Sequence, residues 1–116
     1  MRILQTTAVI GMLTFASLAV AETSVGRWLD AMIPNMPKYD RIIEILIKDD
    51  GAVVLISKSQ DGTSSTRELR ERPGGIYELV GSRSGDKYRI IPADGNLQLL
   101  DNDGLIRVAR RVEGNG

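Results

Sequence analysis

The side chains of this chain that could do chemistry are few, because the sequence contains neither histidine nor cysteine. Without histidine there is no Ser-His-Asp triad, no imidazole metal ligand and no side chain that ordinarily titrates near neutral pH. Without cysteine there is no thiol nucleophile, no cysteine-based zinc site and no disulfide bond. Carboxylates, hydroxyls, arginines and lysines remain, so we predict that the protein is not an enzyme and holds no cofactor.

Two closely spaced carboxylate pairs lie in Asp49–Asp50 and in Asp101–Gly104. The second segment begins like a calcium-binding loop, but such a loop needs a glutamate about six residues after its glycine, and that position is Arg110. A glycosidase needs two carboxylates across a cleft, one of them with a raised pKa, and a chain of this size has little room for a large cleft. We therefore predict no metal site, and a hydrolase that uses bare carboxylates is the least favoured alternative.

Arginines form two clusters along the chain. Their charge is balanced overall, because 15 Lys and Arg accompany 15 Asp and Glu and the formal net charge is zero. A nucleic-acid site would need an excess of positive charge with interleaved aromatic residues, so we expect no nucleic-acid partner. We interpret the clusters as solvated strand faces that pair with neighbouring glutamates, and recognition of an acidic protein or a glycan is the alternative. The arginines are Arg67, Arg70 and Arg72, then Arg107, Arg110 and Arg111, and the glutamates are Glu68, Glu71 and Glu113.

Ser82–Tyr88 is the segment whose composition best suits binding. It offers two hydroxyls, a flexible glycine, charged side chains and an aromatic residue at the start of an expected strand. Binding residues concentrate on loops that a rigid sheet holds in place. The alternative is that its Ser-Gly-Asp sequence simply closes a hairpin. The candidate binding residues are Ser82, Ser84, Lys87 and Tyr88.

This segment resembles the Ser-x-Ser-Gly-x-x-Tyr element of the bacterial C-type lysozyme inhibitors, which are small exported β-barrels. The resemblance implies that the loop inserts into the lysozyme cleft, with Ser84 near the catalytic carboxylates. It covers Ser82–Tyr88 and does not extend to the family's second element, Trp-x-Lys-Gly. Alignment of that glycine on Gly104 places Asp101 at the tryptophan and Asp103 at the lysine. An aspartate that faces the carboxylates of the enzyme would repel them, and the family's cysteine pair is also missing.

The beginning of the chain indicates where the protein works. A short positive start and an apolar stretch are followed by Ala19–Ala21, a small-x-small cleavage pattern, and then by Glu22. Together these features predict a secretory signal peptide over residues 1–21 that is cleaved between Ala21 and Glu22. The apolar stretch is too short for a membrane anchor, which needs roughly 20 residues. We expect a protein exported to the periplasm without a membrane anchor, with residues 22–116 forming one small domain.

Two kinds of element are expected to position the candidate residues, and the first is a helix over residues 22–36. Four apolar residues recur there at the spacing of one helical face, and two prolines would end the helix. We expect this face to pack on the rest of the domain, and a helix that binds a partner is the alternative. The four apolar residues are Val25, Trp28, Leu29 and Met32, and the prolines are Pro34 and Pro37.

The second kind of element is the β-strand, which we expect over residues 41–111. Glycine turns, four of them Asp-Gly, recur along this region and separate short segments that are rich in β-branched residues or alternate with period two. Ile42–Ile47 fits either a strand or a helix face, and its isoleucines favour the strand. Ser64–Arg70 is mostly polar, so we expect an edge strand there. In the last strand, the apolar Ile106 and Val108 are expected to share the inner face.

These elements predict a mainly β protein with a short N-terminal helix and a seven-stranded antiparallel up-and-down meander. The inner face is covered either by the helix or by curling into a small barrel filled by side chains. We expect an exported, non-enzymatic binding or inhibitor module that acts through its hairpin loops on an envelope or foreign protein, such as a lysozyme-like enzyme. The alternative is a structural component of an envelope complex that pairs through its edge strand or its helix.

Overall fold

The structure is a computed structural model that describes residues 22–112 of the chain. The expected signal peptide, its cleavage site after Ala21 and the last four residues of the chain lie outside this range. Within it, no helix has both the length and the apolar character needed to cross a membrane.

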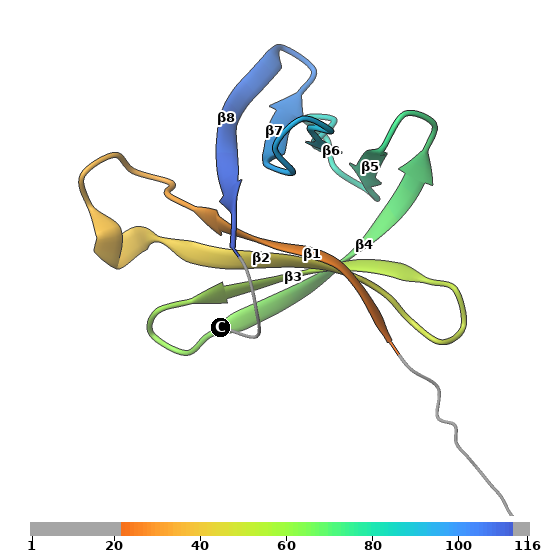
Figure 1. Ribbon diagram of the computed structural model, residues 1–116, viewed down its shortest axis with the longest axis horizontal. Helices are drawn as coiled ribbons and strands as arrows, with labels where there is room; N and C mark the ends of the chain where they lie inside the picture. The colour runs from red at the N-terminus through yellow and green to blue at the C-terminus, as the bar shows by residue number, and fades with distance from the viewer. Residues whose placement is uncertain (1–21, 113–116) are drawn as a thin grey trace, which may run out of the picture.

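The described residues form eight antiparallel strands that follow one another around a closed barrel (Figure 1). Each strand pairs with its neighbours in the chain, and β1 pairs with β8 to close the ring. A short 3-10 turn, η2 (Pro37–Tyr39), lies between the first two strands. The expected mainly β, up-and-down barrel is confirmed, with eight strands instead of seven. The strands are β1 (Thr23–Asp30), β2 (Arg41–Ile47), β3 (Val53–Ser59), β4 (Ser64–Arg72), β5 (Ile76–Leu79), β6 (Lys87–Ile90), β7 (Leu97–Asp101) and β8 (Gly104–Arg111).

The expected N-terminal helix over residues 22–36 is wrong, because its first half forms strand β1. The buried residues of β1 alternate as Gly26, Trp28 and Asp30. Gly26 and Asp30 are not apolar, so the sequence lacks the alternation of apolar residues that would indicate a strand. Met32, which completed the helical pattern, lies in the loop after β1 and is 43% exposed. β1 is held as a strand by pairing with β2 from Thr23 to Asp30, interrupted by one bulge at Val25.

Strands β2 and β4 answer two further expectations. Ile42–Ile47 lies in a strand, β2, in which Ile43 and Ile45 alternate inward and are fully buried. The expected edge strand Ser64–Arg70 is confirmed over its first residues, because Ser64 to Arg67 pair with β3 only, and is wrong from Leu69 onward, where β4 pairs with β5. The start of β4 extends past the end of β5, so one side of it is open although the barrel is closed, and the polar side chains of β4 face the solvent while Leu69 is buried.

The side chains of β8 face the opposite way from the expectation. Ile106 and Val108 are 48% and 46% exposed, whereas Ala109 is buried and Arg107 extends to the buried Asp30. A bulge leaves Ile106 without an opposing residue on β7, and pairing of β8 with β1 sets the register beyond it. The inner face of β8 therefore brings an arginine into the barrel instead of an isoleucine and a valine.

The interior of the barrel is filled by apolar side chains, as expected for strands this short. Trp28 is fully buried, and its indole N–H donates a hydrogen bond to the carbonyl oxygen of Gly95 at 2.7 Å. The guanidinium of Arg111 lies over the same ring, 5.6 Å from its centroid. The buried core consists of Trp28, Ile43, Ile45, Leu55, Leu69, Tyr77, Tyr88, Leu97, Leu99 and Ala109.

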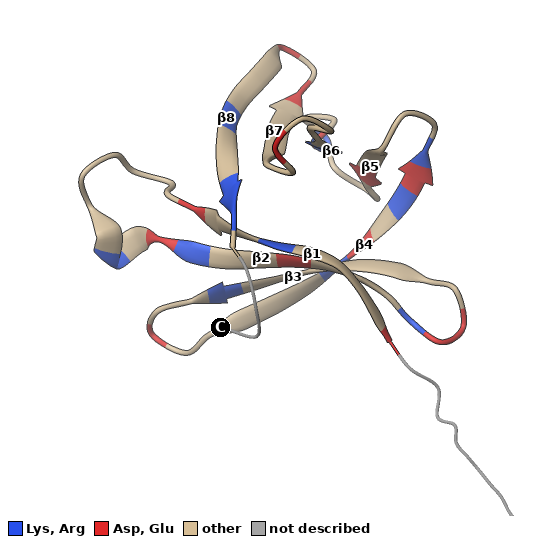
Figure 2. Cartoon of the chain, viewed as in Figure 1, with Lys and Arg blue, Asp and Glu red and all other residues tan. Residues whose placement is uncertain are grey.

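One end of the barrel carries the loops that follow β1, β3, β5 and β7, because neighbouring strands run antiparallel. Asp30 is the last residue of β1 and lies at this end, which we call the Asp30 end. Basic and acidic residues are interspersed over the strands and do not gather by sign (Figure 2). The electrostatic character of the Asp30 end therefore depends on the local arrangement of its side chains.

Candidate binding site at the Asp30 end of the barrel

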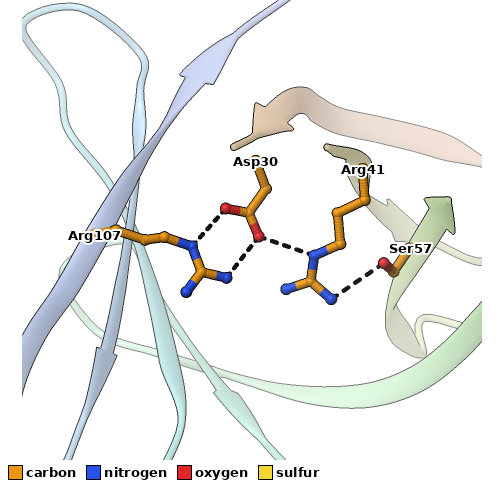
Figure 3. Close-up of polar contacts among 4 residues, drawn as sticks. All are labelled: Asp30, Arg41, Ser57 and Arg107. Atoms are coloured by element: carbon orange, nitrogen blue, oxygen red, sulfur yellow. Dashed lines mark hydrogen bonds and ion pairs between the residues drawn. The ribbon is translucent and has the colours of Figure 1, made fainter. Parts of the chain in front are cut away.

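Asp30 is a fully buried carboxylate held by two arginines from other strands (Figure 3). Arg107 of β8 donates from Nε to Oδ1 at 2.6 Å and from Nη2 to Oδ2 at 2.8 Å. Arg41 of β2 donates from Nε to Oδ2 at 2.8 Å, and its Nη1 donates to the hydroxyl of Ser57 on β3 at 3.3 Å. The cluster therefore ties β1 to β2, β3 and β8 at this end.

The two arginines keep Asp30 ionised although it is buried. Burial alone would raise the pKa of the carboxyl, but hydrogen bonds from Arg107 and Arg41, together with their charges, outweigh it and hold the pKa below the ordinary value. The hydrogen bond with Asp30 likewise raises the pKa of Arg107. An aspartate in this state is unsuited to general acid–base catalysis, which needs a pKa near the working pH.

Sequence reasoning missed this cluster. Asp30 stood within the expected helix, and Arg107 was placed on a solvated strand face. The signal that could have found it is the alternation of Trp28 and Asp30, which is what a strand with an inward carboxylate would show. The first arginine cluster was expected to pair with glutamates near it in the sequence. Arg70 and Arg72 instead pair with Glu78 of β5, at 4.0 and 3.8 Å.

The loop between β5 and β6 is organised around Asp86. Its carboxylate accepts hydrogen bonds from the hydroxyls of Ser82, at 2.8 Å, and Ser84, at 3.2 Å. The backbone N–H of Asp86 in turn donates to the Ser82 hydroxyl at 3.1 Å. Two of the four candidate binding residues therefore lie together, and Asp86, which was not among the candidates, holds them.

The other two candidate residues lie apart from the serines. Lys87 folds back, and its Nζ donates to the carbonyl oxygen of Gly85 at 3.1 Å. Tyr88 belongs to the core and is 8% exposed, because it is the inward residue of β6. The loop thus presents Arg83 and Ser84 to the solvent, while the tyrosine lines the interior below it.

The β5–β6 loop also packs against the hairpin turn between β7 and β8. The N–H of Asn102 donates to the carbonyl oxygen of Ser84 at 2.9 Å. Gly85 has a φ of +69°, and a Cβ at this position would overlap with the side-chain amide of Asn102. Only glycine allows both the positive φ and the close approach of Asn102, so the conformation of the loop depends on Gly85.

A pocket of about 130 Å³ lies between this loop and the Asp30 cluster. Asp86 borders it from the loop side, and the two arginines of the cluster border it from the other side. Burial raises the pKa of Tyr88, which also lines the pocket, so its hydroxyl keeps its proton at neutral pH. The lining residues are Arg41, Asp86, Tyr88, Leu99, Leu100, Ile106 and Arg107.

The two carboxylate pairs noted in the sequence shape hairpin turns. Oδ1 of Asp101 accepts the N–H of Asp103 at 2.8 Å, and Oδ1 of Asp50 accepts the N–H of Ala52 at 2.9 Å. These are local side-chain-to-backbone bonds of the kind that favours aspartate in turns. Searches of the part of the chain that the structure describes found no group of three or more acidic side chains placed to hold a metal ion.

Comparisons of the chain with protein-family models, with curated proteins and with solved structures found no match. Its role therefore has to be inferred from the geometry of the Asp30 end.

Proposed function

We propose that this chain is an exported, non-enzymatic binding module that contacts a protein partner through the β5–β6 loop. The observation that carries the proposal is the bonding of Ser82 and Ser84 to Asp86. A loop held in one conformation before binding loses little conformational entropy when the partner arrives. The loop exposes Arg83 and Ser84, which supply a charge and a hydroxyl for recognition.

Two further observations support a binding role over catalysis. The carboxylate pairs serve hairpin turns, and Asp30 is bonded on both oxygens by arginines. A general acid or base must be able to exchange its proton with a substrate, and neither arrangement favours this. A c-type lysozyme is the first partner to test, because Ser82–Tyr88 resembles the loop of its bacterial inhibitors.

The test is a titration of c-type lysozyme with the purified protein while lysis of a cell-wall suspension is followed. We expect stoichiometric inhibition that Gly85→Ala weakens at least about tenfold, because the new Cβ displaces the loop from Asn102. The matched control is Gly51→Ala. Gly51 also has a positive φ, +88°, but nothing lies within 4 Å of its Cβ position and it lies at the other end of the barrel.

Each outcome of this titration bears on the proposal. No inhibition by the unchanged protein would reject lysozyme as the partner. Equal inhibition by the unchanged protein and by Gly85→Ala would reject the β5–β6 loop as the contact surface. Equal loss in both glycine variants would show that the effect is one of stability and would also contradict a specific role of the loop.

A second candidate function, assembly through a strand edge, is favoured by a different observation. β8 is paired with β1 only through Arg110 and Arg111, so Gly104–Val108 has β7 on one side and no strand on the other (Figure 1). The N–H of Val112 donates to the carbonyl oxygen of Arg27. Because alternate residues of an antiparallel strand point their backbone groups to the same side, the N–H and C=O of Val108 point to this open side.

Among residues 22–112, the large exposed apolar side chains lie on the open half of β8 and on the loop that follows β1. A protected edge would carry outward charges, whereas the bulge in β8 turns apolar residues outward. The exposed residues are Met32, Ile33, Met36, Tyr39, Leu105, Ile106 and Val108.

We propose a second copy of this chain as the occupant of the β8 edge. Asp103 precedes the edge and Arg110 follows it, and both are exposed. Antiparallel pairing of two copies places Arg110 of each beside Asp103 of the other, whereas parallel pairing would place like charges together. The zero net charge of the chain adds no overall repulsion between copies.

A further inference from the structure

We propose that the pocket between the Asp30 cluster and the β5–β6 loop binds a small carboxylate that carries a hydrogen-bond donor on the adjacent carbon. Free α-amino and α-hydroxy acids have this chemistry, and so does the last residue of a peptide. The site is formed by Arg41, Arg107, Tyr88 and Asp86. It is separate from the exposed tip of the loop, so it does not depend on the binding of a protein partner there.

The two arginines supply donors that the protein itself does not use. Asp30 and Ser57 occupy Nε and Nη1 of Arg41, and Asp30 occupies Nε and Nη2 of Arg107. Nη2 of Arg41 and Nη1 of Arg107 have no partner among the described residues. Figure 3 shows both of these nitrogens below the Asp30 carboxylate, where no dashed line reaches them. Guanidinium N–H groups that border a pocket are suited to a carboxylate ligand.

Tyr88 adds an unpaired buried hydroxyl to the same pocket. Its side chain is 8% exposed and lines the pocket, and within residues 22–112 its hydroxyl has no hydrogen-bond partner. Buried polar groups are ordinarily hydrogen-bonded, and an exception calls for an explanation. A carboxylate oxygen in the pocket would accept the O–H of Tyr88 together with the free N–H groups of the arginines.

Asp86 determines which carboxylates fit. Around the pocket, the charges of Arg41 and Arg107 are balanced by those of Asp30 and Asp86. An anion that carries no hydrogen-bond donor of its own would therefore be repelled by the carboxylate of Asp86. A ligand with an ammonium, hydroxyl or amide N–H beside its carboxylate places that donor toward Asp86 while its carboxylate faces the arginines.

The volume of the pocket suits a ligand with a small side chain. About 130 Å³ corresponds to roughly four times the 30 Å³ share of one water molecule in the liquid. This accommodates a carboxylate, the adjacent carbon with its donor, and one methyl group. Leu99, Leu100 and Ile106 form an apolar wall for that methyl, so alanine and lactate are the probes of matching size.

The test measures binding of alanine, lactate and N-acetylalanine to the purified protein by calorimetry and by amide chemical shifts in NMR. Alaninamide, which lacks the carboxylate, and propionate, which lacks the donor, are the comparison compounds. We expect at least one of the three probes to bind, and both comparison compounds to bind at least about tenfold more weakly than that probe. If N-acetylalanine binds as tightly as alanine, the natural ligand is a peptide terminus. If only alanine or lactate binds, it is a free acid.

The decisive variant is Tyr88→Phe, which removes the unpaired hydroxyl and keeps the ring in the core. We expect it to weaken binding of the probe about tenfold. Tyr77→Phe is the matched control, because Tyr77 is also a buried core tyrosine, 6% exposed, but does not line this pocket. Absence of binding by all three probes, equal binding of alaninamide, or unchanged affinity in Tyr88→Phe would each overturn the proposal. A thermal melt confirms that both variants are folded.

Discussion

At the scale of single residues, Asp30 is the side chain on which the described structure depends most. It is fully buried, and both of its oxygens accept hydrogen bonds from arginines that are themselves about one quarter exposed. Taking such charges out of water is costly, and their attraction offsets this cost only while every partner is present. Loss of one partner leaves buried charge uncompensated. Removal of a single partner should therefore cost more stability than the intact cluster contributes in net terms.

Asp30→Asn should lower the free energy of unfolding by about 2 to 4 kcal/mol, because it leaves Arg41 and Arg107 without their shared anion. The pKa of Asp30 is lowered in the folded state from its ordinary value of 3.8. Its contribution is therefore fully present above that value and is lost as the pH falls through the lower folded-state pKa. Denaturant unfolding at about pH 7 and about pH 3 measures both effects.

The control for this experiment is Asp61→Asn. Hydrogen bonds from Thr63 also lower the pKa of Asp61, but this residue is exposed in the β3–β4 loop. We expect a much smaller loss at neutral pH than in Asp30→Asn, and a pH dependence close to that of the unchanged protein. A pH dependence in Asp30→Asn as steep as that of the unchanged protein would contradict the role given to Asp30.

At the scale of elements, β1 shows how one large side chain sets the requirements of its strand. Trp28 is buried, donates to Gly95 of the loop between β6 and β7, and lies beneath Arg111 of β8. Its ring covers Gly26, where a Cβ would lie 2.7 Å from Cη2 of the indole. Gly26 is thus required for the space it leaves and not for a special backbone conformation.

Gly26→Ala should lower the free energy of unfolding by about 1 to 3 kcal/mol, because the new methyl forces the indole out of its position. The same substitution should cost less in a Trp28→Phe background, where the smaller ring leaves room. A double-mutant cycle, with unfolding followed by circular dichroism, measures this coupling. Additive effects of the two substitutions would show that the methyl group and the ring do not compete for space.

At the scale of the whole molecule, the seam between β1 and β8 decides what the barrel offers to a partner. Arg110 and Arg111 pair with β1, whereas all seven residues of β2 pair with β1. The short seam leaves the first half of β8 open and places the Asp30–Arg107 ion pair beneath the opening. Closure of the barrel and exposure of an edge therefore occur together in this chain.

Val108→Lys should weaken self-association of the purified protein at least about tenfold, because it places a strongly hydrated charge on the apolar edge. Sedimentation equilibrium over a range of concentrations measures the dissociation constant of the dimer. Val54→Lys is the matched control, since Val54 is also a partly exposed valine but lies on β3 between Leu46 of β2 and Glu68 of β4, to both of which it is paired. A protein that remains monomeric at about 1 mM, or equal effects of both lysines, would contradict the second-copy proposal.

The sequence by itself determined the positions of the hairpin turns and of most strands, because these depend on neighbouring residues. Asp-Gly pairs place positive φ values and side-chain-to-backbone bonds within a few residues, and Gly51, Gly62, Gly95 and Gly104 all have positive φ. Strand β2 was likewise recognisable, since its isoleucines suit a pleated and buried surface. For the candidate site, Ser82 and Ser84 could be found because they lie together in one short hairpin loop, although their partner Asp86 was missed.

Only the tertiary structure decided which residues face one another across the barrel. Asp30 and Arg107 are 77 residues apart, and no residue close to either one in the sequence indicates that they form an ion pair. The strand character of β1, the outward direction of Ile106 and Val108, and the point at which β4 begins to pair with β5 all follow from registers between strands. A one-residue change of register moves every side chain of a strand to its other face. A local sequence pattern therefore predicts where a strand lies but not which of its faces points into the barrel.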